Sequence, residues 1–329
     1  MSLTATLNSG VSALNAFSTG LQVISNNISN VNTVGYKSSN ADYSDSFSDI
    51  LRQAAPSPSS GTGSNTDPLQ VGTGVRVGAI TSNFTQGTLS STGKNTDLGI
   101  SGAGFFVVRD TGNAVNYATR AGDFRLDDSG YLVTNNGYRV QGLSDGAAAY
   151  SAVVNSGALS YVQTTTAPAT VGDIKVDFNL SIGSGLTNNT GGAFTDAQVN
   201  AGKPTIRSFT VDQSGNVVIN LSNGESFNRG RVLMQNFSDP NALTRVGDNL
   251  FSGIASAGPI GGVALSATNN GPGSNGLGQI QSGALELSNV DLSKEMTDMI
   301  IAQRSFQAGS RIVTVADTLL QETVDLKRQ

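Results

Sequence analysis

The residue types that most often carry out chemistry in proteins are scarce in this chain of 329 residues. It contains no histidine and no cysteine, so the commonest general bases, zinc ligands and thiol nucleophiles are absent. A glycine-rich stretch at residues 72–78 superficially resembles a phosphate-binding loop. Its third glycine does not have the spacing found in such a loop, and the stretch leads into a strand pattern rather than a helix. We therefore expect no nucleotide-binding loop there.

Acidic residues in two short segments, 127–129 and 212–214, could suggest a calcium site. Neither segment has the distal bidentate glutamate of a calcium loop, and both have the composition of turns. No pair of acidic residues stands out for glycosidase chemistry. The sequence thus predicts that the protein is not an enzyme and has no catalytic residues, no metal site and no cofactor.

Charge and hydropathy exclude several other classes of protein. The net charge of −5 is small and there is no basic block, which argues against nucleic-acid binding. No apolar run approaches the ~20 residues of a membrane span, and the N-terminal segment lacks the features of a signal peptide. Charged residues make up only 13% of the chain, a composition that suits an extracellular protein. We expect export by a route that does not use a cleaved signal.

The N-terminal segment carries a seven-residue apolar repeat. A sustained repeat of this kind predicts a helix that packs against other helices. No charged residue precedes Lys37, and an uncharged polar face suits a helix surrounded by other helices or lining a narrow passage. The expected assembly seam on this helix consists of Leu7, Leu14, Phe17, Leu21, Ile24, Ile28 and Val31.

A second heptad row occupies the C-terminus. Heptad spacing can also mark a helix that simply packs on its own domain. Matching rows at both ends of a chain with a β-rich interior favour a coiled-coil stem formed by the two termini. The expected seam on the C-terminal helix consists of Leu292, Met299, Phe306, Val313 and Leu320.

The interior of the chain has the patterns of β-structure. Apolar residues on either side of the Asp-Asp-Ser-Gly segment at 127–130 predict a hairpin with positive φ at Gly130, and a related turn lies at 212–215. Residues 288–291 have the spacing of a helix capping box.

The expected fold class is therefore α+β, with a nested domain order. The domains comprise a helical coiled-coil stem (1–35 plus 288–329), a connecting segment with a Pro-, Ser- and Gly-rich arm (36–70), a mainly antiparallel inner β domain (71–143 plus 230–287) and an inserted small outer β domain (144–229).

Three stretches together resemble the flagellar axial-protein family, whose members build the rod and the hook of the bacterial flagellum. They are residues 25–37, 97–106 and 283–307, which cover both ends and the inner β domain. The core of the third stretch, residues 289–295 (NVDLSKE), favours the hook members over the rod members. The residues that match the family's motifs are Asn26, Asn27, Asn30, Gly35, Tyr36, Lys37, Asn289, Asp291, Gln303 and Arg304.

The resemblance implies a mechanical function. The chain is expected to polymerise into the hollow, flexible hook, which transmits motor torque and lets exported subunits pass through its channel. Implied partners are further copies of the chain, the distal rod protein, the hook cap, the hook–filament junction proteins and the flagellar export apparatus. The implied location is the extracellular hook, reached by the flagellar type III route.

Two alternatives remain open. Residues 50–74 resemble an insertion of the distal rod protein, so the distal rod is the second expectation. A β-rich surface adhesin with a coiled-coil stalk is the alternative from a different class, and it would require an anchoring or secretion signal.

Overall fold

The computed structural model describes residues 3–54, 65, 67–144, 150–155, 158–163, 170–177, 180–182 and 205–328. The chain divides into two compact units. The first unit contains residues 1–31, 37–84 and 290–329, and the second contains residues 32–36 and 85–289. The expected α+β fold class is confirmed, with helices at the two ends of the chain and mainly antiparallel strands between them.

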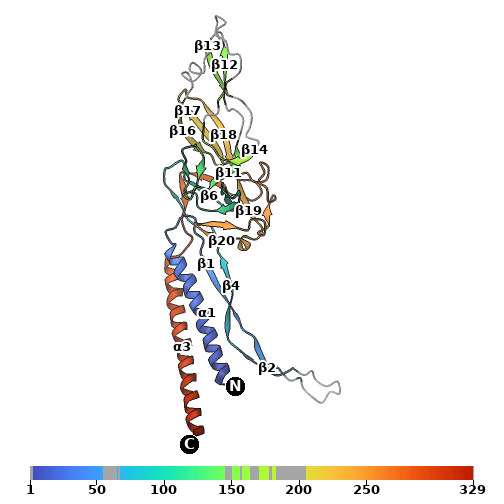
Figure 1. Ribbon diagram of the computed structural model, residues 1–329, viewed down its shortest axis with the longest axis vertical. Coiled ribbons are helices and arrows are strands. Elements are labelled where there is room, and N and C mark those ends of the chain that lie inside the picture. The colour runs from blue at the N-terminus through green and yellow to red at the C-terminus, as the bar shows by residue number, and fades with distance from the viewer. Residues whose placement is uncertain are drawn as a thin grey trace. The chain divides into compact units, whose positions relative to one another are not determined.

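The first unit is built around two long helices, α1 (Leu3–Ser29) and α3 (Leu292–Arg328), which run side by side (Figure 1). The side chain of Asp291 caps α3, accepting hydrogen bonds from the backbone N–H groups of Ser293 at 2.9 Å and Lys294 at 3.2 Å. A short polar acceptor at this position satisfies N–H groups that have no partner within the helix. The N-cap is thus the last residue of the predicted capping box rather than its first.

A long antiparallel ribbon accompanies the helices in this unit. Its first part pairs β1 (Ser39–Asp45) with β4 (Val75–Ser82), and its second part pairs β2 (Ser48–Arg52) with β3 (Leu69–Gly72). The N–H of Ser46 donates to the carbonyl of Gly74 at 2.7 Å, which joins the two parts. The division expected at residue 70 therefore differs from the structure, because pairing of β1 with β4 places residues 71–84 with the stem.

The second unit is centred on a large sheet in which, among the described residues, β11 (Arg139–Ser144) pairs with four other strands. Its partners are β7 (Phe105–Arg109), β10 (Leu132–Val133), β14 (Thr170–Asp173) and β18 (Ser226–Val232). Strand β18 crosses the expected boundary between residues 229 and 230: its C-terminal residues pair with β11, and β17, which lies in the expected outer domain, pairs with it on the other side. Residues 205–232 therefore share this sheet and its core rather than forming a separate layer.

The other strands of the sheet extend it on both sides. They are β8 (Asn116–Thr119), β9 (Arg125–Leu126), β16 (Ile206–Val211), β17 (Asn216–Leu221), β19 (Met234–Phe237), β20 (Thr244–Gly247), β21 (Leu250–Ser252) and β22 (Pro259–Ile260), with a short 3-10 helix at Pro240–Ala242.

Three smaller sheets complete the unit. Two are pairs, β23 (Gln279–Ser282) with β6 (Leu98–Ser101) and β24 (Ala284–Glu286) with β5 (Leu89–Ser91). The third contains β12 (Tyr150–Asn155), β13 (Ala158–Gln163) and β15 (Leu180–Ile182).

Both predicted turns are present. Gly130 has a φ of +79° and Gly215 a φ of +80°, a region that glycine adopts without steric cost. The carboxylates of Asp127 and Asp212 each accept a backbone N–H bond at 2.8 Å across their turn. The core beside these turns consists of apolar side chains that are almost completely buried, among them Leu98, Phe106, Val108, Val140, Ile219 and Met234.

Candidate functional site

Small residues bring α1 and α3 into close contact. A Cβ atom added at Gly10 would lie 2.9 Å from Cγ2 of Val313, and one added at Gly309 would lie 3.4 Å from Cδ2 of Leu14. On α3, the buried positions opposite α1 repeat every seven residues at Ala302, Gly309 and Ala316. The intramolecular contact of the stem is therefore a row of small residues, which a heptad pattern of large apolar side chains does not reveal.

The predicted seam residues flank this small-residue row. All seven N-terminal seam residues are half-buried; six lie on α1, and Val31 lies just beyond its end at Ser29. On α3, Met299, Val313 and Leu320 are half-buried, whereas Leu292 and Phe306 are 40% and 38% exposed. The structure brings Leu14 and Val313 to the helix contact. A role of the seam in contacts between copies stays a prediction.

A second, exposed apolar face follows most of the length of α3. We call it the outer face of α3, and it is formed by Ile301, Ile312, Val315, Leu319 and Leu326, with exposed fractions from 47% to 74%. Contiguous exposed apolar surface of this kind typically marks a site of interaction with another protein.

Asn27 joins three segments of the first unit. Its side chain is 1% exposed, and its Oδ1 accepts the N–H of Ser39 at 2.9 Å while its Nδ2 donates to the Ser39 carbonyl at 2.8 Å. The same Nδ2 donates to Oε1 of Glu295 on α3 at 3.1 Å. Burial raises the pKa of the Glu295 carboxyl, and the hydrogen bond from Asn27 opposes that rise. One amide thus connects the end of α1, the start of β1 and the first turn of α3.

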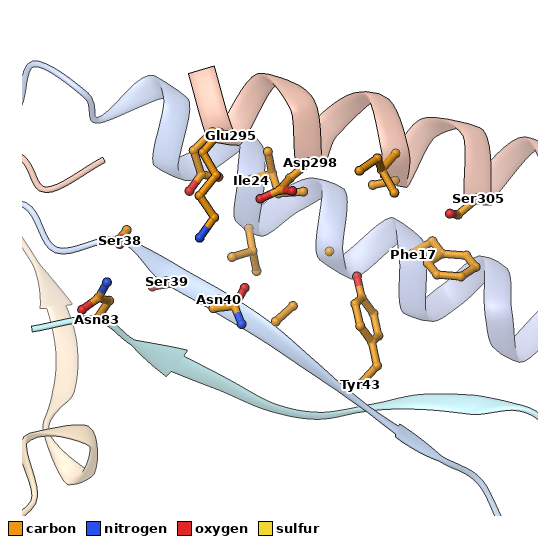
Figure 2. A pocket seen from close by; sticks show the side chains of 16 residues that line it. Phe17, Ile24, Ser38, Ser39, Asn40, Tyr43, Asn83, Glu295, Asp298 and Ser305 are labelled. Carbon is orange, nitrogen blue, oxygen red and sulfur yellow. The ribbon is translucent and has the colours of Figure 1, made fainter. Parts of the chain in front are cut away.

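The ribbon packs along α1 through matched large and small residues. A Cβ at Gly20 would clash with the hydroxyl of Tyr43, and the Tyr43 ring meets Phe17 edge-on with centroids 5.9 Å apart. Further along, Oγ of Ser12 accepts the N–H of Val75 at 3.4 Å. Between α1, α3 and β1 remains a cavity of about 340 Å³ (Figure 2).

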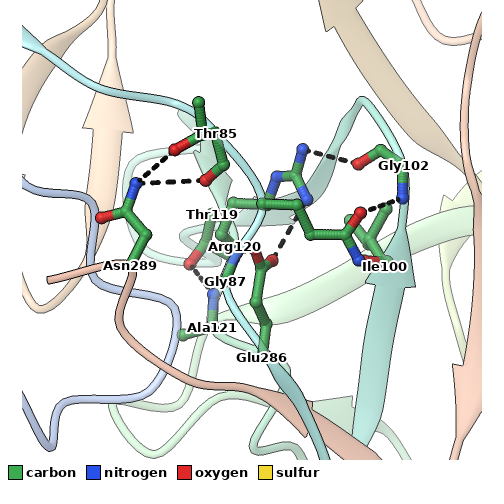
Figure 3. A network of polar contacts seen from close by, with 10 residues as sticks. Thr85, Gly87, Ile100, Gly102, Thr119, Arg120, Ala121, Glu286 and Asn289 are labelled. Carbon is green, nitrogen blue, oxygen red and sulfur yellow. Dashed lines mark hydrogen bonds and ion pairs between the residues drawn. The ribbon is translucent and has the colours of Figure 1, made fainter. Parts of the chain in front are cut away.

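A buried ion pair organises the second unit close to its first residues. Nη1 of Arg120 lies 3.1 Å from Oε2 of Glu286, and the two side chains are 4% and 0% exposed (Figure 3). The other carboxylate oxygen of Glu286 accepts the N–H of Gly87 at 2.8 Å, and Nη2 of Arg120 donates to the carbonyl of Gly102 at 3.0 Å. Burial lowers the pKa of Arg120, and the charge of Glu286 opposes that shift.

Residues 32–36 attach to the second unit beside this ion pair. The N–H of Gly35 donates to the Glu286 carbonyl at 2.8 Å, and Gly35 has a φ of +67°. A Cβ there would clash with the backbone of Ala121, so both conformation and space require glycine. Tyr36 is 5% exposed and lies under the guanidinium of Arg245, 5.1 Å from the ring centroid.

Known protein families match the parts of the chain that contain these helices and this ion pair. Three family models match the chain: "Flagella basal body rod protein" at residues 7–37, "Flagellar hook protein FlgE/F/G D1 domain" at residues 99–219, and "Flagellar basal body rod FlgEFG protein C-terminal" at residues 281–326. The flagellar basal-body rod protein FlgG of Bacillus subtilis is 35% identical over 322 residues, which cover 98% of each chain.

The chain belongs to the flagellar rod and hook protein family. This family consists of structural proteins of the flagellar axis, so polymerisation within that axis and a flagellar location follow. Another relative, the flagellar hook protein FlgE of Borreliella burgdorferi, is 28% identical over 450 residues, covering 98% of this chain and 99% of the relative. The FlgG protein of Caulobacter vibrioides is 29% identical over 322 residues, covering 98% of each chain.

Most of the motif residues expected from this family have structural roles. Asn27, Gly35 and Asp291 make the backbone contacts described above. Nδ2 of Asn30 donates to the Asn26 carbonyl at 2.9 Å, and Nδ2 of Asn289 donates to the Thr85 carbonyl at 3.1 Å.

Three further motif residues differ from one another in burial. Lys37 is 1% exposed. Gln303 and Arg304 lie on the exposed side of α3 in the single chain.

No group of three or more metal-ligating side chains occurs within the described residues. No helix in that part of the chain is both long and apolar enough to cross a membrane. The glycine-rich stretch at 72–78 lies in the ribbon, at the end of β3 and the start of β4.

Proposed function

We propose that the chain is a structural subunit of the flagellar hook, which polymerises into a hollow, bendable tube between rod and filament. The observation that carries this proposal is the outer face of α3, an apolar surface along a long helix that stays 47% to 74% exposed in the single chain. Burying it against further copies stabilises a polymer through the hydrophobic effect. A subunit intended to remain monomeric would carry polar residues there.

Residues 289–295 favour the hook over the rod. They resemble the hook members of the family, and in this chain they have defined contacts: Asp291 caps α3, and Glu295 bonds to Asn27. Named hook proteins are also among the relatives that align with nearly the whole chain.

The distal rod is the second candidate function, and two observations favour it. The relative with 35% identity is named a rod protein, and its alignment with this chain is 322 residues long. The alignment with the hook protein of Borreliella burgdorferi is 450 residues long. In addition, the β2–β3 part of the ribbon coincides with the stretch that resembles a distal rod insertion.

The uncharged helix α1 supports a role in lining the export channel. Its exposed positions include Asn8, Asn15, Gln22, Ser25 and Asn26, and it contains no ionisable side chain. Fixed charges on a channel wall would attract charged segments of the unfolded chains that pass. In this proposal α1 faces the lumen, and the β-strands of the second unit form outer layers that slide when the tube bends.

Partners follow from a position in the hook. They are further copies of the chain, the distal rod protein, the hook cap, the hook–filament junction proteins and the export apparatus of the flagellar type III route.

Electron microscopy of basal bodies from cells that lack the gene tests this function. Loss of the curved segment with an intact rod is the expected result. Loss of the distal rod would replace the hook proposal with the second candidate, and normal basal bodies would contradict both. Restoring the gene from a plasmid is the control for effects on neighbouring genes.

A further inference from the structure

Phe47 is an exposed aromatic side chain on hydrogen-bonded backbone. It is 83% exposed, more than any other large apolar side chain among the described residues. Its carbonyl accepts the N–H of Thr73 at 2.9 Å, and the neighbouring Ser46 bonds to Gly74 at 2.7 Å. The ring therefore projects from paired backbone rather than from a free loop, which lowers the conformational entropy lost when it binds.

The cavity beside α1 could accept such a ring. Its volume is about 340 Å³, and Phe17, Ile24, Tyr43 and Ile301 contribute apolar walls. In Figure 2 the labelled Phe17 and Tyr43 lie toward one end, and Glu295 and Asn83 lie toward the other. Half of the lining residues are polar, among them Lys294, Glu295 and Asp298, so the end of the cavity at Phe17 and Tyr43 is the part that suits an apolar ring.

Phe47 cannot enter the cavity of its own chain. Tyr43 lines that cavity, and Phe47 follows it by four residues, between the end of β1 and the start of β2. Four residues of extended backbone span about 13 Å, and the pairing with Thr73 and Gly74 prevents the ribbon from folding back. Only the Phe47 of another copy can reach the cavity.

We propose that Phe47 of one copy inserts into the cavity of a second copy between α1, α3 and β1. This inference rests on the proposed function only in requiring that the chain polymerises. The two complementary surfaces lie at different places on one chain, so the contact is heterologous, and repeating it fits a helical polymer rather than a two-fold dimer. Aromatic side chains that fill pockets are the usual dominant contributors to such contacts.

The absence of cysteine from the chain permits a direct test by cross-linking. Two single variants, Phe47→Cys and Ala41→Cys, are co-expressed so that both enter the same tubes, and the tubes are then oxidised. Ala41 lines the cavity. Disulfide-linked dimers are expected only in the mixed tubes, because a disulfide requires Cα atoms within about 7 Å. The matched control replaces Phe47→Cys with Leu69→Cys, another exposed apolar position on the ribbon.

Three outcomes overturn the contact: mixed tubes without dimers, equal dimer yields with Leu69→Cys, or equal yields from Phe47→Cys alone. A second measurement does not depend on the cysteine variants assembling. Phe47→Ala is expected to raise the critical concentration for polymerisation at least tenfold, whereas Leu69→Ala changes it less than threefold. Equal effects of the two variants would contradict the proposal. Both measurements report a contact between copies of the chain and not the position of those copies in the flagellum. The contact can therefore be refuted while microscopy supports the hook, and it can be supported while microscopy identifies a rod.

Discussion

Arg120 and Glu286 meet inside the second unit although 166 residues separate them in the sequence. Their charged atoms lie 3.1 Å apart, and both side chains are removed from solvent. A buried charge that loses its partner is far more costly than an exposed one. This pair therefore holds strands from distant parts of the chain in one arrangement.

Replacing Arg120 with Met should destabilise the full chain by about 3–5 kcal/mol, because it leaves the Glu286 carboxylate buried without its counter-charge. Urea unfolding followed by circular dichroism measures the change. The control is Lys175→Met, which breaks the ion pair between Lys175 and Asp177. These two side chains are 31% and 29% exposed, so the loss of stability should be less than about 1 kcal/mol. Similar losses in both variants would contradict the role of burial.

Gly20→Ala should weaken the packing of the ribbon on α1, because the added methyl group meets the hydroxyl of Tyr43. Overpacking of this kind costs about 1–3 kcal/mol, although alanine favours the helix itself. Tyr43→Phe removes the clashing oxygen and should restore much of the loss in the double variant. The amount of tube formed per cell measures the effect, and a double variant no better than Gly20→Ala would refute the contact.

Leu14→Asp should abolish tube formation while leaving the second unit folded. It places a carboxylate at the contact with Gly309, at a cost of several kcal/mol for the buried charge and roughly 2–5 kcal/mol for the lost leucine contacts. Asn15→Asp introduces the same charge at the adjacent, exposed position and is the matched control. Electron microscopy reports whether tubes form, and the melting of purified protein reports whether the second unit is still folded. Normal tubes from Leu14→Asp protein would rule out the seam as a buried contact.

Glu295 should make the stem less stable as pH rises. Because burial raises its pKa above the ordinary value of 4.5, the folded stem binds the proton more tightly than the unfolded chain does. Its contribution is fully present below that value and is lost as pH rises through the folded pKa. Glu295→Gln keeps an acceptor for Asn27 and should flatten this part of the profile. The critical concentration for polymerisation at pH 4 to 7 tests the sign, and a steeper profile in Glu295→Gln would contradict it.

The sequence predicts those parts of the structure that local patterns determine. Heptad spacing predicted both helices, and the Asp-x-Ser-Gly turns predicted the strands around Gly130 and Gly215. The sequence predicts only a connecting segment with an arm for residues 39–52 and assigns residues 75–82 to the inner β domain, whereas the structure pairs residues 39–45 with 75–82 in one ribbon. Pairing between strands so far apart has no local signal.

The contacts of the motif residues could not be derived from their spacing. Asn27 bonds to Ser39 and Glu295, and nothing in an Asn-Asn pair specifies partners 12 and 268 residues away. The row at Ala302, Gly309 and Ala316 was accessible, because small residues at heptad spacing are a sequence signal for close helix approach.

The hydrogen bond from Nδ2 of Asn289 to the Thr85 carbonyl, at 3.1 Å, brings the two ends of segment 85–289 of the second unit to one place. A unit whose entry and exit points are adjacent can be lengthened, shortened or exchanged without altering the rest of the chain. Recombination between genes for rod and hook subunits could therefore replace the interior as a single cassette while retaining the terminal helices. Relatives of very different length can diversify in this way from one ancestral frame.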